Sequence, residues 1–403
     1  MKVLMFGWEF PPMSSGGLGT ACYGLTKGLS RRGVEITLVL PHSPEDYNSE
    51  FVKVISPNFK SKFTIKKIVS ALKPYMSSED YQRSIVRNQK RNVKIYGSNL
   101  LEEVYRFAAA AAEIAEEEDF DVIHCHDWMT FGAGIIAKMK KNKPLVVHVH
   151  ATEFDRSGGS GVNQQVYDIE RQGMHAADRI IAVSSYTKNI IVNHYGISPQ
   201  KVQVVHNAVD YKEPDFSEQF GIKKNDKIVL FLGRITLQKG PDYFVYAAKK
   251  VLEKEKNVKF IMVGTGDMEA KMIEKAAELG ISDKILFAGF LGPQDVDRAF
   301  LMADVYVMPS VSEPFGITAL EAMKNDTPVI VSKQSGVSEV ITHCFKVDFW
   351  DINELSSKII SLLRYSTLHH SMKENARMEI RKFTWDVPAD KCIDVYGRVI
   401  HHG

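Results

Sequence analysis

Short apolar runs alternate along the chain with stretches in which apolar residues recur at helical spacing. The runs are rich in β-branched and aromatic residues and end at glycine, proline or polar residues, which is the pattern of buried strands. They occupy residues 1–7, 35–40, 121–128, 145–150, 179–185, 227–232, 259–264, 285–290, 305–308 and 328–331. Because strands and helical stretches alternate, we predict an α/β fold whose parallel sheets carry helices on both faces.

The length of the chain predicts two domains. The chain has 403 residues, which is more than one hydrophobic core usually supports. The apolar pattern lapses after Val209, and we place the boundary there. We expect one domain over residues 1–209 and a second over residues 210–384, with a last helix over residues 385–403 that crosses back to the first. Residues 41–99 are polar and irregular, and we expect an insertion there.

The segment that follows the strand over residues 305–308 carries two carboxylates. Pro309 ends the strand and helical spacing begins at Ile317, so Glu313 lies in a loop that opens a helix. Free amides at a helix N-terminus attract anions, and carboxylates suit sugar hydroxyls. With Glu321 one turn into the helix, the segment predicts a ligand with both phosphates and hydroxyls. The alternative is a capped surface helix with a glutamate at each end.

Two other loops between a strand and a helix carry residues of ligand-binding type. After the first strand, Gly16 and Gly17 let the backbone approach a ligand before a helix expected over residues 21–32, although the G-x-G-x-x-G dinucleotide motif is absent. After the first strand of the second domain, Arg234 and Lys239 suit a diphosphate. On spacing alone, the alternative of two surface cations is equally favoured.

Histidines occur at the ends of two apolar strands. His124 and His126 lie on one strand face by the period of two, and His148 and His150 repeat the arrangement. Such pairs begin many metal-dependent hydrolase sites, which need further ligands from other strands. The sequence offers no third cluster of such ligands, so we expect histidines that hydrogen-bond or contact substrate. The loop over residues 153–161 is glycine-rich, and we expect it to be flexible.

Composition restricts the partners and the compartment. The chain is 44% hydrophobic with a formal charge of +2, which demands neither nucleic acid nor lipid. A membrane-spanning helix needs about 18 or more apolar residues, and no apolar run approaches that length. The first apolar run is too short for a signal peptide. The cysteines lack paired spacing, so we expect reduced thiols in a cytoplasmic protein. They are Cys22, Cys125, Cys344 and Cys392.

Taken together, these motifs resemble the retaining nucleotide-sugar glycosyltransferases of the GT-B fold over nearly the whole chain, and especially the glycogen and starch synthase branch. The segments that carry the resemblance are residues 16–19 (GGLG), residues 126–128 (HDW), the strand ending at His150, residues 206–210 (HNAVD), Arg234 with Lys239, and Glu313 with Glu321. The resemblance implies two Rossmann-like domains facing a cleft, with the donor nucleotide held mainly by the second.

The resemblance also implies a role for each motif. Arg234 and Lys239 would bind the diphosphate and stabilise it as it leaves. Glu313 would contact the transferred sugar, Glu321 would hold the ribose hydroxyls, and His150 would lie near the anomeric carbon. The other residues expected to contact ligands are Gly16, Gly17, Phe315, Gly316, Ile317 and Thr318 on the donor side, and Asp127 and Glu153 on the acceptor side.

The implied reaction transfers a hexosyl unit, glucose in the leading hypothesis, from a nucleoside diphosphate sugar to an α-glucan. An acceptor hydroxyl attacking from the face of the leaving group would retain the anomeric configuration. Because cationic side chains can replace a divalent metal beside the leaving diphosphate, we expect no metal and no other cofactor.

Two departures from the family pattern leave the specificity open. Ser14 stands where many synthases have the lysine of K-x-G-G-L, and the position of Glu321 is commonly not glutamate in bacterial enzymes that use ADP-glucose. The donor nucleotide can therefore be UDP, ADP or GDP, and the acceptor can be a lipid, a sugar phosphate or a small metabolite. The sequence does not give the oligomeric state.

Two hypotheses from other classes remain. One is a metal-dependent hydrolase built on the four histidines. The other is a catalytically silent module that binds a sugar or a nucleotide, and the presence of both cations and both glutamates counts against it.

Overall fold

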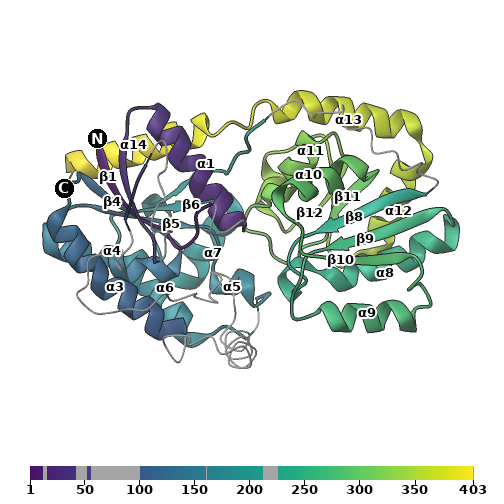
Figure 1. Ribbon diagram of the computed structural model, residues 1–403, viewed down its shortest axis with the longest axis horizontal. Helices are drawn as coiled ribbons and strands as arrows, with labels where there is room; N and C mark the ends of the chain where they lie inside the picture. Colours follow the sequence, from purple (N-terminus) through teal and green to yellow (C-terminus); the bar gives the residue numbers. More distant parts are fainter. Residues whose placement is uncertain (12–15, 42–51, 56–99, 160, 212–225, 403) are drawn as a thin grey trace. The chain divides into compact units, whose positions relative to one another are not determined.

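A computed structural model describes residues 1–11, 16–41, 52–55, 100–159, 161–211 and 226–402. The chain divides into two compact units, each an α/β body (Figure 1). Unit 1 comprises Met1–Glu153, Val162–His206 and Trp385–Gly403, and unit 2 comprises Phe154–Gly161 and Asn207–Thr384. No helix among the described residues is long and apolar enough to cross a membrane.

The described strands of unit 1 form one parallel sheet in the order β3-β2-β1-β4-β5-β6-β7. They are β1 (Lys2–Phe6), β2 (Glu35–Val39), β3 (Lys53–Ile55), β4 (Val122–His126), β5 (Leu145–Val149), β6 (Arg179–Ala182) and β7 (Val202–Val204). Every residue of β4 and β5 is buried. Burial on both faces explains why these strands appear in the sequence as continuous apolar runs.

Helices cover the sheet of unit 1 on both faces. They are α1 (Gly17–Arg31), α3 (Leu100–Glu117), α4 (Trp128–Lys141), α6 (Gln164–Ala176), α7 (Ser185–Tyr195), the 3-10 turn η2 (Pro199–Lys201) and α14 (Asp386–His402). The last helix packs on α1 (Figure 1), because Gly24 leaves room there: an added Cβ would lie 2.0 Å from the Trp385 ring. The prediction that the C-terminal helix returns to the first domain is therefore confirmed.

Unit 2 contains a second parallel sheet, with the order β10-β9-β8-β11-β12-β13 among its described strands. Its strands are β8 (Lys227–Leu232), β9 (Val258–Val263), β10 (Ile285–Gly289), β11 (Val305–Met308), β12 (Val329–Ser332) and β13 (Phe345–Val347). Its helices are η3 (Leu237–Lys239), α8 (Pro241–Lys254), α9 (Glu269–Glu278), α10 (Pro293–Met302), α11 (Ile317–Lys324), η4 (Gly336–Glu339), α12 (Ile352–Arg364) and α13 (Ser366–Ile380). This strand order is that of a doubly wound nucleotide-binding sheet, so the predicted fold class is confirmed.

Several local predictions need correction. Helix α1 begins at Gly17, four residues before the expected start at residue 21, so Gly17 belongs to the helix and Gly16 caps it. The loop expected over residues 153–161 begins with the short helix α5 (Glu153–Arg156). Within the insertion expected over residues 41–99, the described residues 53–55 form strand β3, which pairs with β2. The other residues from 56 to 99 lie outside the described residues, as does Ser14.

Candidate active site

The strand order of each sheet reverses at one place, between β1 and β4 in unit 1 and between β8 and β11 in unit 2. Open α/β sheets bind ligands outside the carboxyl ends of their strands at this kind of switch point. In unit 2, Arg234 and Lys239 follow β8, and Glu313 follows β11. The fold therefore brings residues that are distant in the sequence to the same edge of one sheet.

Lys239 and Glu313 contact each other directly. The Lys239 Nζ atom forms an ion pair with Glu313 Oε2. The hydroxyl of Ser310 donates to the same carboxylate oxygen at 3.3 Å. Glu313 is only 5% exposed, so its charge is balanced by a lysine rather than by bulk water. The cation predicted for the diphosphate and the acid predicted for the sugar thus contact each other directly.

Backbone hydrogen bonds fix the loop that carries Glu313. Its amide donates to the Gln334 carbonyl at 2.9 Å, and the Gly336 amide donates to the Glu313 carbonyl at 2.9 Å. This pairing continues the sheet past the end of β11 as an isolated parallel bridge between Glu313 and Ser335. The carboxylate therefore stands on a short extension of the sheet instead of a free loop.

Gln238 is a residue of this edge for which the sequence analysis proposed no role. Its side-chain oxygen accepts a hydrogen bond from the Arg234 guanidinium at 3.0 Å, and its carbonyl accepts one from the Val311 amide at 2.9 Å. Gln238 is 3% exposed, so its hydrogen bonds connect the loop after β8 to the loop after β11 in the interior of unit 2. The one signal in the sequence is its position between Arg234 and Lys239.

Helix α11 begins at this edge, as predicted. Gly316 caps it with a φ of +103°, a conformation that favours glycine, and the first helical amides have no partner within the helix. The Thr318 hydroxyl accepts a hydrogen bond from the Tyr306 hydroxyl at 2.9 Å, which ties the first turn to β11. Phe315 is buried, with its carbonyl bonded to the Val337 amide at 2.6 Å. The amides of Ile317 and Thr318 are thus the backbone donors that this helix can offer to an anion.

Glu321 lies one turn into α11 and is partly buried. Burial raises the pKa of its carboxyl, Lys324 lowers it, and Asp297 adds a smaller increase. The two predicted glutamates therefore lie in different electrostatic environments. Glu313 forms an ion pair with Lys239, whereas the cost of burying Glu321 is only partly offset by Lys324.

Unit 1 offers a separate set of residues at the carboxyl edge of its own sheet. Gly16 and Gly17 form the N-terminus of α1 after β1, and His150 directly follows β5. Gly17 is exposed, and a Cβ added there would meet nothing within 4 Å. The structure thus places each of these predicted residues near the switch point of unit 1.

Asp127 anchors the backbone next to His150. Its carboxylate accepts hydrogen bonds from the amides of His150 at 2.6 Å and Ala151 at 3.3 Å, and its side chain is buried. Its φ of +59° with ψ of 169° is strained for a residue with a side chain, and such strain is typical of functional sites. Glu153, the other residue expected on the acceptor side, is partly buried and accepts from the Asn163 amide at 3.2 Å.

Four histidines, which lie on β4, on β5 and directly after β5, form a stack. Ring centroids lie 4.5 Å apart for His124 and His126, and 4.2 Å apart for His148 and His150, with interplanar angles of 16° and 21°. Nitrogen atoms of His124, His126 and His148 lie within 4.8 Å of one another, close enough for a metal to be considered. Nearly parallel rings direct their lone pairs along parallel planes rather than to one point, so this arrangement does not favour shared coordination.

All four rings are neutral at physiological pH. Burial lowers the pKa of His126 to about 3. It also lowers the pKa of His124, His148 and His150 well below the ordinary value, and the neighbouring histidines add to the effect. Stacked neutral rings avoid the repulsion that adjacent imidazolium ions would suffer.

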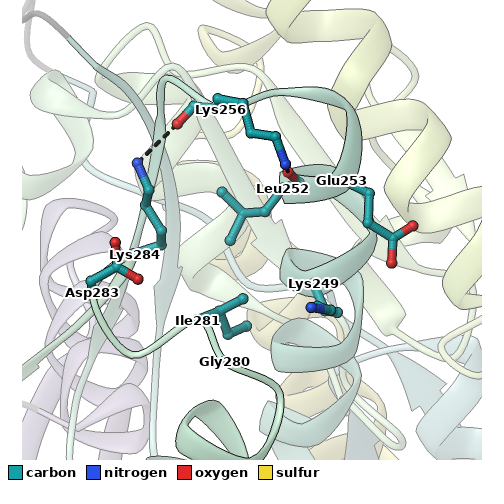
Figure 2. A pocket seen from close by; sticks show the side chains of 8 residues that line it. All are labelled: Lys249, Leu252, Glu253, Lys256, Gly280, Ile281, Asp283 and Lys284. Atoms are coloured by element: carbon teal, nitrogen blue, oxygen red, sulfur yellow. Dashed lines mark hydrogen bonds between the residues drawn. The ribbon is translucent and has the colours of Figure 1, made fainter.

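Unit 2 also has a pocket whose lining includes Lys249, Lys256 and Lys284 (Figure 2). It lies where α8 ends and β10 begins, at the amino ends of the strands. Its Lys256 and Lys284 donate to the carbonyls of Leu252 at 2.7 Å and of Lys256 at 2.9 Å. These lysines cap backbone groups at the end of α8, so we do not assign the pocket to the active site.

Comparison with known proteins identifies the family of the chain. Residues 15–213 match the model of Glycosyltransferase Family 4, and residues 212–379 match that of Glycosyl transferases group 1. A Methanocaldococcus jannaschii protein described as an uncharacterized glycosyltransferase is 30% identical over 98% of both chains. The D-inositol 3-phosphate glycosyltransferase of Gordonia bronchialis is 27% identical, over 72% of this chain and 68% of that one.

More distant similarities extend over most of the chain. Glycogen synthase of Mycobacterium tuberculosis is 23% identical, over 85% of this chain and 80% of that one. Among solved structures, sucrose-phosphate synthase of Thermosynechococcus elongatus is similar over 100% of both chains, with a TM-score of 0.78 at 18% identity. The chain therefore belongs to the group 1 glycosyltransferases of the GT-B fold, enzymes that use nucleotide-sugar donors.

Proposed function

We propose that this glycosyltransferase moves a hexosyl unit, glucose in the first instance, from a nucleoside diphosphate sugar to an α-glucan with retention of configuration. The observation that carries the proposal is the contact between Lys239 and Glu313 at the switch point of unit 2. A cation beside an acid at this edge suits a ligand whose phosphate and sugar are adjacent.

In the proposed reaction, the bond between the anomeric carbon and the diphosphate oxygen breaks. Arg234 and Lys239 stabilise the negative charge that develops on the leaving diphosphate. Glu313 accepts hydrogen bonds from the transferred sugar, and the amides of Phe315, Gly316, Ile317 and Thr318 support the donor.

The acceptor hydroxyl attacks from the face that the diphosphate leaves, and its proton passes to the departing phosphate. The proposal includes Gly16, Gly17 and His150 as further donor contacts, and Asp127 and Glu153 on the acceptor side. We further propose that the transfer needs no metal, since two side-chain cations supply positive charge at the leaving group.

A donor and acceptor panel tests this function. UDP-, ADP- and GDP-glucose are each incubated with glycogen in the presence of a chelator, and nucleotide release is measured together with the anomeric configuration of the product. We expect one of the three donors to give much faster nucleotide release than the other two. We also expect an α-linked product and no loss of rate with the chelator. A β-linked product, or a rate restored only by added metal, would contradict the mechanism.

A phosphorylated polyol is the second candidate acceptor. The D-inositol 3-phosphate glycosyltransferase is 27% identical to this chain, compared with 23% for the glycogen synthase. Adding inositol phosphate to the same panel distinguishes the two candidates. Release that depends on inositol phosphate and not on glycogen would replace the glucan proposal while leaving the donor site unchanged.

Glu321→Gln is expected to stabilise the fold and to weaken donor binding. The folded state raises the pKa of this carboxyl, so the wild type loses stability as pH rises from the ordinary glutamate pKa to the raised one. The neutral amide lacks that loss, so the unfolding free energy of the variant should exceed that of the wild type above this window. Losing a charged acceptor for ribose hydroxyls should weaken donor affinity about tenfold or more.

Denaturant unfolding from acidic to neutral pH measures the first effect, and calorimetric titration with the donor measures the second. Glu354→Gln is a control, because Glu354 is likewise a partly buried glutamate on a helix of unit 2 but lies away from the switch point. Unchanged donor affinity in Glu321→Gln would remove Glu321 from the site.

A further inference from the structure

The ring of His126 is hydrogen-bonded to the ring of His150. Its Nδ1 atom lies 2.9 Å from Nε2 of His150, and both side chains are buried. The strands explain the contact: β4 and β5 are neighbours in register, with His126 opposite His148. His150, two residues beyond His148 and directly after β5, then comes within reach of His126 from the same sheet face.

Only one of these two neutral rings can donate the shared proton. If His150 donated from Nε2, His126 would accept at Nδ1 and carry its own proton at Nε2. That Nε2 atom is buried and has no hydrogen-bond partner among the described residues. A buried N–H without an acceptor is rarer and costlier than an acceptor without a donor.

The alternative arrangement avoids this cost. If His126 carries its proton at Nδ1, it donates to His150, and its buried Nε2 is left as a lone pair. His150 then accepts at Nε2 and, being neutral, must hold its own proton at Nδ1.

We propose that His126 is a positioning residue that fixes His150 as the Nδ1–H tautomer, so that His150 offers the substrate a hydrogen-bond donor instead of a lone pair. The role rests on the proposed placement of the donor sugar at His150. A fixed N–H donor can hold a sugar hydroxyl oxygen, and it cannot act as a general base at that nitrogen. In this proposal His126, which does not contact the substrate, determines whether His150 donates or accepts the hydrogen bond to the substrate.

His148 supplies a matched control. Its ring stacks on His150 at 4.2 Å, closer than the 5.2 Å between the rings of His126 and His150. Both nitrogens of His148 are buried without a hydrogen-bond partner among the described residues, so it contributes packing to His150 and no proton. Replacing His148 removes the stacked neighbour while keeping the hydrogen bond.

The first measurement is the tautomer itself. Two-bond nitrogen–proton correlation spectra of the full chain, without substrate, should show His150 protonated at Nδ1 and bare at Nε2. The same spectra of His126→Leu should show a mixture or the reversed tautomer. A wild-type His150 protonated at Nε2 would overturn the proposal, whatever the activity of the enzyme.

The second measurement compares three variants in the nucleotide-release assay. His126→Leu should lower kcat about tenfold or more with little change in the donor KM, because a wrong tautomer removes an oriented contact at the reacting centre. His126→Asn should recover most of the loss, since its amide nitrogen is bonded to Cγ, as Nδ1 is in histidine. His148→Leu should lose clearly less than His126→Leu.

Equal losses in His126→Leu and His148→Leu, or no recovery in His126→Asn, would show that the ring acts through packing alone and would overturn the proposal. Thermal unfolding of each variant verifies that the compared enzymes are folded. A wild type that releases no nucleotide from any donor would contradict the proposed function, and the spectra would still decide the tautomer.

Discussion

Lys239→Ala is expected to lower the kcat of nucleotide release by a factor of about 10² to 10³. Lys239 is one of two cations proposed to meet the leaving diphosphate, and charge develops there as the sugar departs. The donor KM should rise less than kcat falls, because the interaction is strongest in the transition state. Steady-state kinetics with a saturating acceptor measure both constants.

The variant also leaves Glu313 buried without its cation, so part of any loss could arise from instability. The double variant Lys239→Ala/Glu313→Gln removes the uncompensated charge and separates the two effects. Lys249→Ala is a matched control, since Lys249 lines the pocket where α8 ends and β10 begins (Figure 2). If the kcat of Lys239→Ala stayed within about threefold of the wild-type value, the proposed contact between this lysine and the leaving group would be contradicted.

Glu313→Ala should also lose most of its nucleotide release, but for a different reason. It removes the hydrogen-bond acceptor proposed for the transferred sugar. It also removes the carboxylate that forms the ion pair with Lys239. Comparing the two variants over a series of donor sugars distinguishes their roles. Only the Glu313 variant should change the preference among sugars.

The sequence predicted both members of this ion pair but not their contact. Lys239 and Glu313 are 74 residues apart, and they meet because β8 and β11 are adjacent where the strand order reverses. A pattern of apolar runs identifies strands without giving their order, so this information was not in the periodicity. The family resemblance supplied the pairing of roles that periodicity could not.

Two of the elements that the sequence did not reveal lack a clear period. Helix α4 (Trp128–Lys141) begins with buried residues on several sides and contains two glycines, so it lacks the polar face that marks a surface helix. Strand β13 (Phe345–Val347) is too short for alternation to be recognised. The backbone conformation of Asp127 was equally hidden, because the two amides that its carboxylate binds follow β5 and are distant from Asp127 in the sequence.

Gly240→Ala is expected to disrupt both stability and activity, through one contact. Gly240 follows Lys239 with a φ of +62°, and an added Cβ would lie 2.2 Å from the Pro309 carbonyl oxygen. The left-handed backbone alone costs an alanine about 1 to 2 kcal/mol, and the clash should add about 1 to 3 kcal/mol more. Relief requires Pro309 to move, and with it the adjacent Ser310 and the loop that carries Glu313.

Gly280→Ala separates the clash from the backbone strain. Gly280 has a similar φ of +68°, but an added Cβ there meets nothing within 4 Å. It should therefore cost only the backbone strain of about 1 to 2 kcal/mol and leave kcat unchanged. Gly240→Ala should unfold at clearly lower denaturant concentration and, while still folded, lose about 10²-fold in kcat, since Glu313 would shift away from Lys239. Equal destabilisation by the two substitutions with full activity would mean that the Pro309 contact does not hold the glutamate in place, because the loop would then have absorbed the added methyl group without moving the carboxylate.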